Sequence, residues 1–123
     1  MDRFFFIVGS VSGGMAVALG AFAAHGLRAR LSPELLTTFE TGARYQMYHA
    51  LALLAVSFAL TRWQSTGVST VAGWLFAAGT VLFSGSLYLL AVTGARWLGA
   101  ITPLGGIAFI AGWICLVVAA ARG

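Results

Sequence analysis

Three long runs of this chain contain no charged residue, and they constrain its fold more than any other feature. The runs extend from Phe4 to Ala24, from Val71 to Val92 and from Trp97 to Ala121. A helix needs about 20 mostly apolar residues to cross the hydrocarbon core of a bilayer. Each run is therefore predicted to form a transmembrane helix.

The composition places the whole chain in the membrane class. Its 123 residues are enough for one compact unit and no second domain. They are 60% hydrophobic and 8% charged, with a mean hydropathy of +0.95. A soluble domain carries about 25% charged residues. This chain has too few charged residues to form a surface that is exposed to water on all sides. We expect a single all-α membrane domain over residues 1–123.

The formal net charge of +4 comes from seven arginines, with no lysine and three acidic residues. The arginines are scattered along the chain, whereas a nucleic-acid interface needs basic residues clustered on one face. Arginines at helix ends anchor a protein among lipid headgroups. The lipid bilayer is the expected partner, and nucleic acid is not. With Cys115 as the single cysteine, no intrachain disulfide is possible.

A further span is predicted from a helix start. The apolar run from Met47 to Leu60 is too short to cross the membrane alone. It is preceded by Ser32-Pro33-Glu34, which supplies a serine N-cap, proline at the first helical position and an acid in the first turn. No proline follows before Pro103. One helix is therefore expected from Pro33 to about Thr61, roughly 42 Å long.

The predicted spans cover residues 4–25, 33–61, 71–92 and 97–121. The links from Arg62 to Thr70 and from Thr93 to Arg96 are short, so neighbouring helices should be antiparallel. This predicts an up-down-up-down four-helix transmembrane bundle whose second helix has an amphipathic N-terminal extension. The arginines divide almost evenly between the two sides of the membrane. The positive-inside rule therefore gives little indication of which side faces the cytoplasm. Cytoplasmic termini are favoured if Arg44 is paired within the fold.

An alternative treats the first run as a secretory signal peptide, because Ala21-Phe22-Ala23 resembles a cleavage site. The run is longer than a typical signal-peptide core, and Asp2 offsets the charge of Arg3. A retained first span is the preferred interpretation.

Small residues recur at four-residue spacing within the spans. Such rows allow close helix packing in lipid. The candidate packing positions are Gly9, Gly13, Gly20, Gly73 and Gly112. Packing within one chain is the simpler interpretation, and a homo-oligomer face is the alternative.

The polar segment from His25 to His49 holds half of the charged residues and both histidines. On a helical wheel its second part has one apolar side and one polar arc. Gln46 is the main residue that departs from this division. Glu40 and Arg44 are four residues apart in the favourable order, so they can pair.

The predicted topology brings the polar ends of all four spans to one side of the membrane. The resulting candidate cluster consists of His25, Glu40, Arg44, Tyr45, Gln46, Tyr48, His49, Ser84, Ser86 and Thr102. The preferred interpretation is a structural network that fixes helix packing. The alternative is a site for a proton, an ion, or a small polar or lipid ligand.

Two other interpretations of the cluster receive less support. The two histidines could ligate a metal or haem, but no cysteine or carboxylate set completes a specific pattern. A dyad of Ser84 or Ser86 with a histidine lacks any surrounding nucleophile motif. No metal, cofactor or catalytic residue is therefore predicted.

Four strings in the chain resemble the signatures of one small membrane family. They are Gly20-Ala21-Phe22-Ala23-Ala24-His25-Gly26-Leu27, Phe39-Glu40-Thr41-Gly42-Ala43-Arg44-Tyr45-Gln46-Met47-Tyr48-His49-Ala50, Leu82-Phe83-Ser84-Gly85-Ser86-Leu87-Tyr88 and Thr102-Pro103-Leu104-Gly105-Gly106. The resemblance is to domain-of-unknown-function family 423, which includes YgdD-like and YwdK-like bacterial proteins and is similar to eukaryotic transmembrane protein 256. Ala23 stands where the family pattern has glycine.

The resemblance implies a four-span protein of the bacterial inner membrane, or of mitochondria in the eukaryotic branch, and supplies no activity. We expect a non-enzymatic scaffold or accessory protein, which could form a homo-oligomer or join a larger membrane complex. The alternative is a small transporter, channel or ligand-binding protein that uses the polar cluster. A membrane enzyme or haem carrier is the third class.

Overall fold

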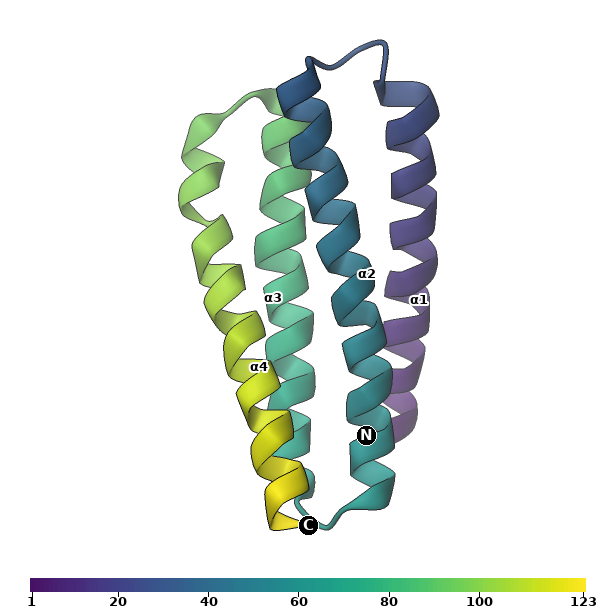
Figure 1. Ribbon diagram of the computed structural model, residues 1–123, viewed down its shortest axis with the longest axis vertical. Helices are drawn as coiled ribbons and strands as arrows, with labels where there is room; N and C mark the ends of the chain where they lie inside the picture. Colours follow the sequence, from purple (N-terminus) through teal and green to yellow (C-terminus); the bar gives the residue numbers. More distant parts are fainter.

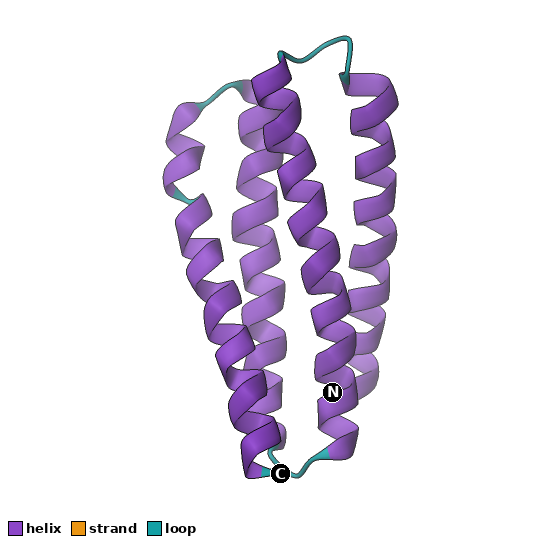
Figure 2. Cartoon of the chain, viewed as in Figure 1, coloured by secondary structure: helices purple, strands orange, loops and turns teal.

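The computed structural model describes all residues from Met1 to Gly123, and all of the regular secondary structure is helical (Figure 2). Its elements are α1 (Asp2–Phe22) with a π-helical turn (Ala23–Leu27), α2 (Pro33–Arg62), α3 (Thr66–Thr93), a 3-10 turn (Arg96–Ala100) and α4 (Thr102–Arg122). The predicted all-α class is confirmed. Successive helices run in opposite directions, and both termini lie at the end where α2 is joined to α3 (Figure 1).

The helices pack in chain order without closing into a ring. α1 packs on α2, α2 on α3 and α3 on α4, with a smaller approach between α2 and α4. α1 and α4 lie on opposite sides of the molecule (Figure 1). The outer flanks of α1 and α4 therefore remain uncovered, and both carry exposed large apolar side chains such as Ile7 and Val117.

The start of α2 follows the sequence prediction. The Ser32 hydroxyl accepts a hydrogen bond from the Leu35 amide at 3.3 Å, and Pro33 occupies the first turn. The helix continues without a break for 30 residues to Arg62. Its length is therefore about 45 Å at 1.5 Å per residue.

The expected link from Arg62 to Thr70 is wrong, because α3 already begins at Thr66. Glycine and β-branched residues in this segment are poor helix formers in isolation, which made it look like a loop. In the structure the buried Ser69 hydroxyl donates to the Ser65 carbonyl at 3.0 Å. Tertiary burial and this local hydrogen bond extend the helix by five residues.

The fourth span is also less regular than expected. Residues Arg96–Ala100 form a 3-10 turn, and the α-helix begins only at Thr102. Pro103 lacks an amide proton and its ring would clash with the carbonyl four residues earlier in a continuous helix. The break therefore lies directly before the proline.

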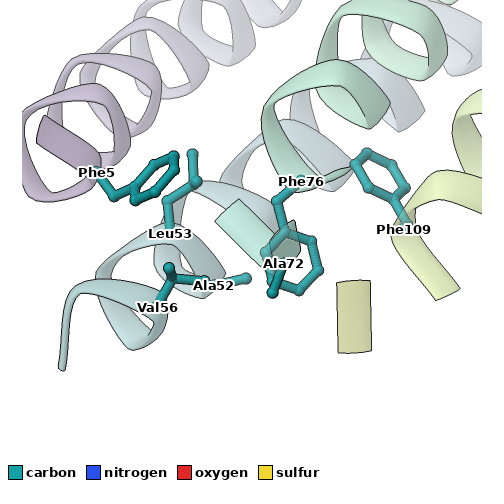
Figure 3. Packing of buried hydrophobic residues seen from close by; sticks show 7 residues of the cluster. All are labelled: Phe5, Ala52, Leu53, Val56, Ala72, Phe76 and Phe109. Carbon is teal, nitrogen blue, oxygen red and sulfur yellow. The ribbon is translucent and has the colours of Figure 1, made fainter. Parts of the chain in front are cut away.

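The main core draws buried side chains from all four helices (Figure 3). Phe5 of α1 points towards α2, and Phe109 of α4 lies beside Phe76 of α3 (Figure 3). The buried members of this core are Phe5, Ala52, Leu53, Val56, Ala72, Phe76 and Phe109. A second, smaller core lies near the first loop and consists of Ala23, Leu27, Phe39 and Ala91.

Three of the five predicted packing glycines make close helix contacts. A Cβ atom at Gly9 would lie 2.8 Å from the Ala50 carbonyl oxygen, and one at Gly112 would lie 2.6 Å from the nearest atom of a phenylalanine ring. A Cβ at Gly73 would overlap a phenylalanine ring in the same way. At Gly13 a Cβ would make ordinary contacts, and at Gly20 it would meet nothing within 4 Å. Gly20 therefore takes no part in packing within the chain.

Three helical segments are long and apolar enough to cross a membrane: Asp2–Leu27, Thr66–Thr93 and Arg96–Arg122. They contain the three charge-free runs of the sequence. α2 is not among them because its first half carries the polar segment.

Candidate functional site

His49 is the most deeply placed ionisable residue of the candidate cluster. It lies about 20 Å along α2 from Arg62 and about 24 Å from Pro33. Only 4% of its surface is exposed. Its ring is stacked flat on Phe109, with centroids 3.5 Å apart and an interplanar angle of 4°.

Both ring nitrogens of His49 have hydrogen-bond partners. Nδ1 lies 2.8 Å from the Tyr45 carbonyl oxygen, and Trp113 Nε1 donates to Nε2 at 3.2 Å. A carbonyl can only accept and an indole N–H can only donate. The two contacts are therefore satisfied together by the neutral imidazole with its proton on Nδ1. This ring connects α2 to α4, and neither nitrogen is free to bind a ligand.

Gln46 links three helices. Its side-chain amide donates to the Ser12 carbonyl of α1 at 3.0 Å, and its side-chain oxygen accepts from the Tyr88 hydroxyl of α3 at 2.6 Å. Gln46 is 4% exposed. On the helical wheel Gln46 lay outside the polar arc. The structure shows the reason, because its side chain faces the neighbouring helices α1 and α3.

The candidate serines also serve helix packing. The buried Ser84 hydroxyl donates to the Gly42 carbonyl at 2.7 Å, connecting α3 to α2. Ser86 and Thr102 share a hydrogen bond of 2.6 Å, connecting α3 to the start of α4. Neither serine is hydrogen-bonded to a histidine. The arrangement therefore lacks the contact on which a nucleophilic dyad depends.

The predicted ion pair between Glu40 and Arg44 is absent. The one ion pair in the structure joins the Met1 amine to Asp2 at 3.9 Å. Glu40 and Arg44 instead line a hollow of about 280 Å³ between α1 and α2, beside the open position at Gly20. A spacing of four residues on the helix was therefore not sufficient for pairing.

His25 lies outside these contacts. It is exposed on the π-helical turn after α1 and takes no part in the hydrogen bonds that join the helices. No three histidine, cysteine, aspartate or glutamate side chains come together. The ten candidate residues are therefore divided among separate contacts rather than gathered in one network.

An apolar groove of about 590 Å³ opens between α2 and α4 next to His49. Its walls are mostly aromatic, and it is lined by Tyr45, Tyr48, His49, Phe83, Gly106, Phe109, Ile110 and Trp113. Tyr45, Tyr48 and Trp113 are each between 37% and 48% exposed. The groove has the size of a small-ligand site.

Sequence reasoning missed the residues of α3 and α4 that complete this region. The missed residues lie within charge-free runs: Phe83, Phe109 and Trp113. In such a run the sequence does not distinguish a residue that faces His49 from one that faces lipid. Gly42 was also missed as a packing position, and nothing in the sequence separated Gly105, which packs, from Gly106, which does not. A Cβ at Gly105 would lie 2.5 Å from the Phe83 amide nitrogen. Their strings appear in the family signature, which was the one available signal.

Residues 19–106 match the family model described as protein of unknown function (DUF423). The chain belongs to this family. It is 52% identical to the UPF0382 membrane protein YwdK of Bacillus subtilis, over 98% of each chain. It is 49% identical to a UPF0382 membrane protein of Staphylococcus saprophyticus, over 94% of this chain and 95% of that one.

No solved structure matches the chain. Membership of the DUF423 family confirms the resemblance inferred from the four strings. The relatives are named as membrane proteins, which agrees with the three apolar helices. This DUF423 protein is therefore a membrane protein, and its family supplies no activity.

Proposed function

We propose that this DUF423 protein is a four-span, non-enzymatic accessory protein of the bacterial cytoplasmic membrane. One observation supports this proposal above others: five of the six buried polar side chains make hydrogen bonds between helices, and only Ser69 makes a local one. No buried side-chain nitrogen or oxygen lacks a hydrogen-bond partner. Such a molecule has a rigid interior and offers its uncovered flanks to other membrane components.

The proposal requires α2 to be the fourth span. α2 packs against α1 on one side and α3 on the other. A helix held between two transmembrane helices in this way must cross with them. The polar first part of α2 would then lie at one membrane surface. Arg3, Arg62 and Arg122 lie at the opposite ends of their helices and would mark the other surface.

The four spans can be tested by labelling with a membrane-impermeant maleimide. In a Cys115→Ser background, single cysteines replace Arg30 in the first loop, Gln64 in the second loop or Gly94 in the third. We expect Arg30→Cys and Gly94→Cys to be labelled from one side of sealed vesicles and Gln64→Cys from the other. Labelling of Arg30→Cys and Gln64→Cys from the same side would contradict the crossing of α2. A denatured sample of each variant is the control for reactivity.

The accessory role predicts that the protein does not occur alone. Native mass spectrometry from a mild detergent should find it with further copies of itself or with other membrane proteins. The uncovered outer flanks of α1 and α4 are the surfaces for these contacts. A single chain that retains only lipid, from membranes solubilised under conditions that preserve a known complex, would contradict the accessory role.

A single chain that retains lipid would support a second function, the binding of a membrane-soluble ligand. The observation in its favour is the groove between α2 and α4. A channel or transporter receives no comparable support, because the polar groups of Gln46 and His49 are already hydrogen-bonded within the chain.

A further inference from the structure

We propose that the outer face of α2 and the adjoining groove bind one phospholipid with a primary-amine headgroup, phosphatidylethanolamine. The inference rests on the four-span arrangement proposed above. It arises from the order in which charged, hydroxyl and apolar groups follow one another along α2. That order matches the order of groups along such a lipid, from its headgroup to its acyl chain.

The depth of these groups follows from helix geometry. Arg62 marks one membrane surface, and a hydrocarbon core of about 30 Å corresponds to about 20 residues of helix. The other surface therefore crosses α2 close to Glu40. Arg44 then lies a few ångströms inside this surface. Side chains on a helix lean towards its N-terminus, so Arg44 and Tyr48 both reach towards the headgroups.

Glu40 and Arg44 form a charge pattern that is complementary to a zwitterion. They are one helical turn apart on the same face and form no ion pair with each other. Charged side chains near the hydrocarbon are costly unless they find a partner. A phosphate beside Arg44 would place the terminal ammonium of the same lipid one turn further out, beside Glu40. An anionic lipid would satisfy Arg44 only and would be repelled by Glu40.

The next turn supplies hydrogen-bond donors at the level of the lipid esters. Tyr48 follows Arg44 at four residues, and the rings of Tyr45 and Tyr48 are in edge contact with centroids 5.3 Å apart. Tyr88 is the one tyrosine whose hydroxyl is hydrogen-bonded within the chain. The hydroxyls of Tyr45 and Tyr48 are therefore available to donate to ester carbonyls.

Beyond the tyrosine hydroxyls, the groove is an apolar surface on which an acyl chain can pack. Its volume of about 590 Å³ is bounded by the rings of Phe109 and Trp113 and by Gly106. A Cβ atom at Gly106 would meet nothing within 4 Å, so this glycine leaves the groove open without serving helix packing. From the surface inwards, the molecule thus offers a carboxylate and a guanidinium on the side of α2 towards α1, then two phenols, and then an aromatic groove on the side towards α4. The lipid would therefore cross the outer face of α2 obliquely, from Arg44 to Tyr48.

Trp113 can report an acyl chain in the groove. The test uses the full chain with Trp63, Trp74 and Trp97 changed to phenylalanine, so that Trp113 is the single tryptophan. The protein is reconstituted in phosphatidylcholine vesicles in which a rising fraction of phosphatidylethanolamine carries brominated acyl chains, which quench indole fluorescence. Brominated phosphatidylcholine and brominated phosphatidylglycerol are the comparison lipids.

We expect brominated phosphatidylethanolamine to quench Trp113 with saturation and with about threefold higher relative affinity than phosphatidylcholine. Both lipids carry a cation, but only the primary ammonium has N–H groups that can donate hydrogen bonds to the Glu40 carboxylate. Glu40→Gln should remove this preference, and Arg44→Gln should weaken binding of both lipids. Arg62→Gln, at the other surface, is the matched control and should change neither. Equal quenching by all three lipids, or a preference for phosphatidylglycerol, would overturn the proposal.

The groove is tested separately by Gly106→Leu, which adds a side chain to its wall at a position where the Cβ meets nothing within 4 Å. This change should lower quenching by every brominated lipid, whereas Gly14→Leu on the outer face of α1, also open around its Cβ, should leave quenching unchanged. Unchanged quenching in Gly106→Leu would show that no acyl chain lies in the groove. Loss of lipid preference leaves the maleimide labelling and the mass of the complex unaffected, so each proposal can fail alone.

Discussion

Gly105→Leu is expected to separate α3 from α4 and to cause a large loss of stability. A Cβ at this position would lie 2.5 Å from the backbone nitrogen of Phe83 and 2.8 Å from its Cα atom. Backbone atoms inside a helix cannot move aside as a flexible side chain can. Overpacking typically costs about 1–3 kcal/mol, and we expect a loss at the upper end of this range or beyond it.

The adjacent glycine provides the matched control. Gly106→Leu adds the same atoms to the same helix, but its Cβ meets nothing within 4 Å. Leucine also favours helix more than glycine does, so the free energy of unfolding should stay level or rise slightly. Reversible unfolding in mixed detergent micelles measures both variants. Equal losses at positions 105 and 106 would contradict the close packing of α3 on α4.

His49→Ala is expected to lower the free energy of unfolding by about 2–4 kcal/mol, as for other large-to-small changes in a core. The change removes the ring stacked on Phe109 and leaves the Trp113 N–H without its acceptor. His49→Phe keeps the stacking and loses only the hydrogen bonds. Its loss should be smaller, about 1–2 kcal/mol.

Glu40→Gln serves as the control for the His49 variants. Glu40 makes no ion pair and lies at the edge of a hollow, so its replacement should change stability by less than about 0.5 kcal/mol. Unfolding of all three variants in the same micelles gives the comparison. If Glu40→Gln were as destabilising as His49→Ala, the two residues would belong to one structural network after all.

Much of the fold could be predicted from sequence because each prediction depended on local physics. Charge-free runs of sufficient length must be buried in lipid or protein, which identified three helices. Ser32 and Pro33 predicted the start of α2, and in the structure the Ser32 hydroxyl accepts a hydrogen bond from the amide of Leu35 in the first turn. The start of α3 was missed because residues 66–70 are weak helix formers, and packing rather than propensity decided their conformation.

The candidate site was only partly predictable for a different reason. The polar residues of α2 stood out against an apolar background, so the sequence identified Gln46 and His49 as unusual. Their partners did not stand out. Trp113 and Phe109 are ordinary residues of an apolar run. The Ser12 acceptor of Gln46 and the Tyr45 acceptor of His49 are backbone carbonyls, which carry no sequence signal.

The sequence alone therefore determined that this is an all-helical membrane protein and where its helices lie, apart from the starts of α3 and α4. It also determined that the polar residues of α2 are unusual. Only the tertiary structure decided which of them meet. It left Glu40 and Arg44 without an ion pair beside a hollow, enclosed His49 between Phe109 and Trp113, and left α1 and α4 uncovered on their outer flanks. The physical reason is that periodicity fixes the face of a helix on which a residue lies, whereas the rotation and approach of the neighbouring helices determine what that face contacts.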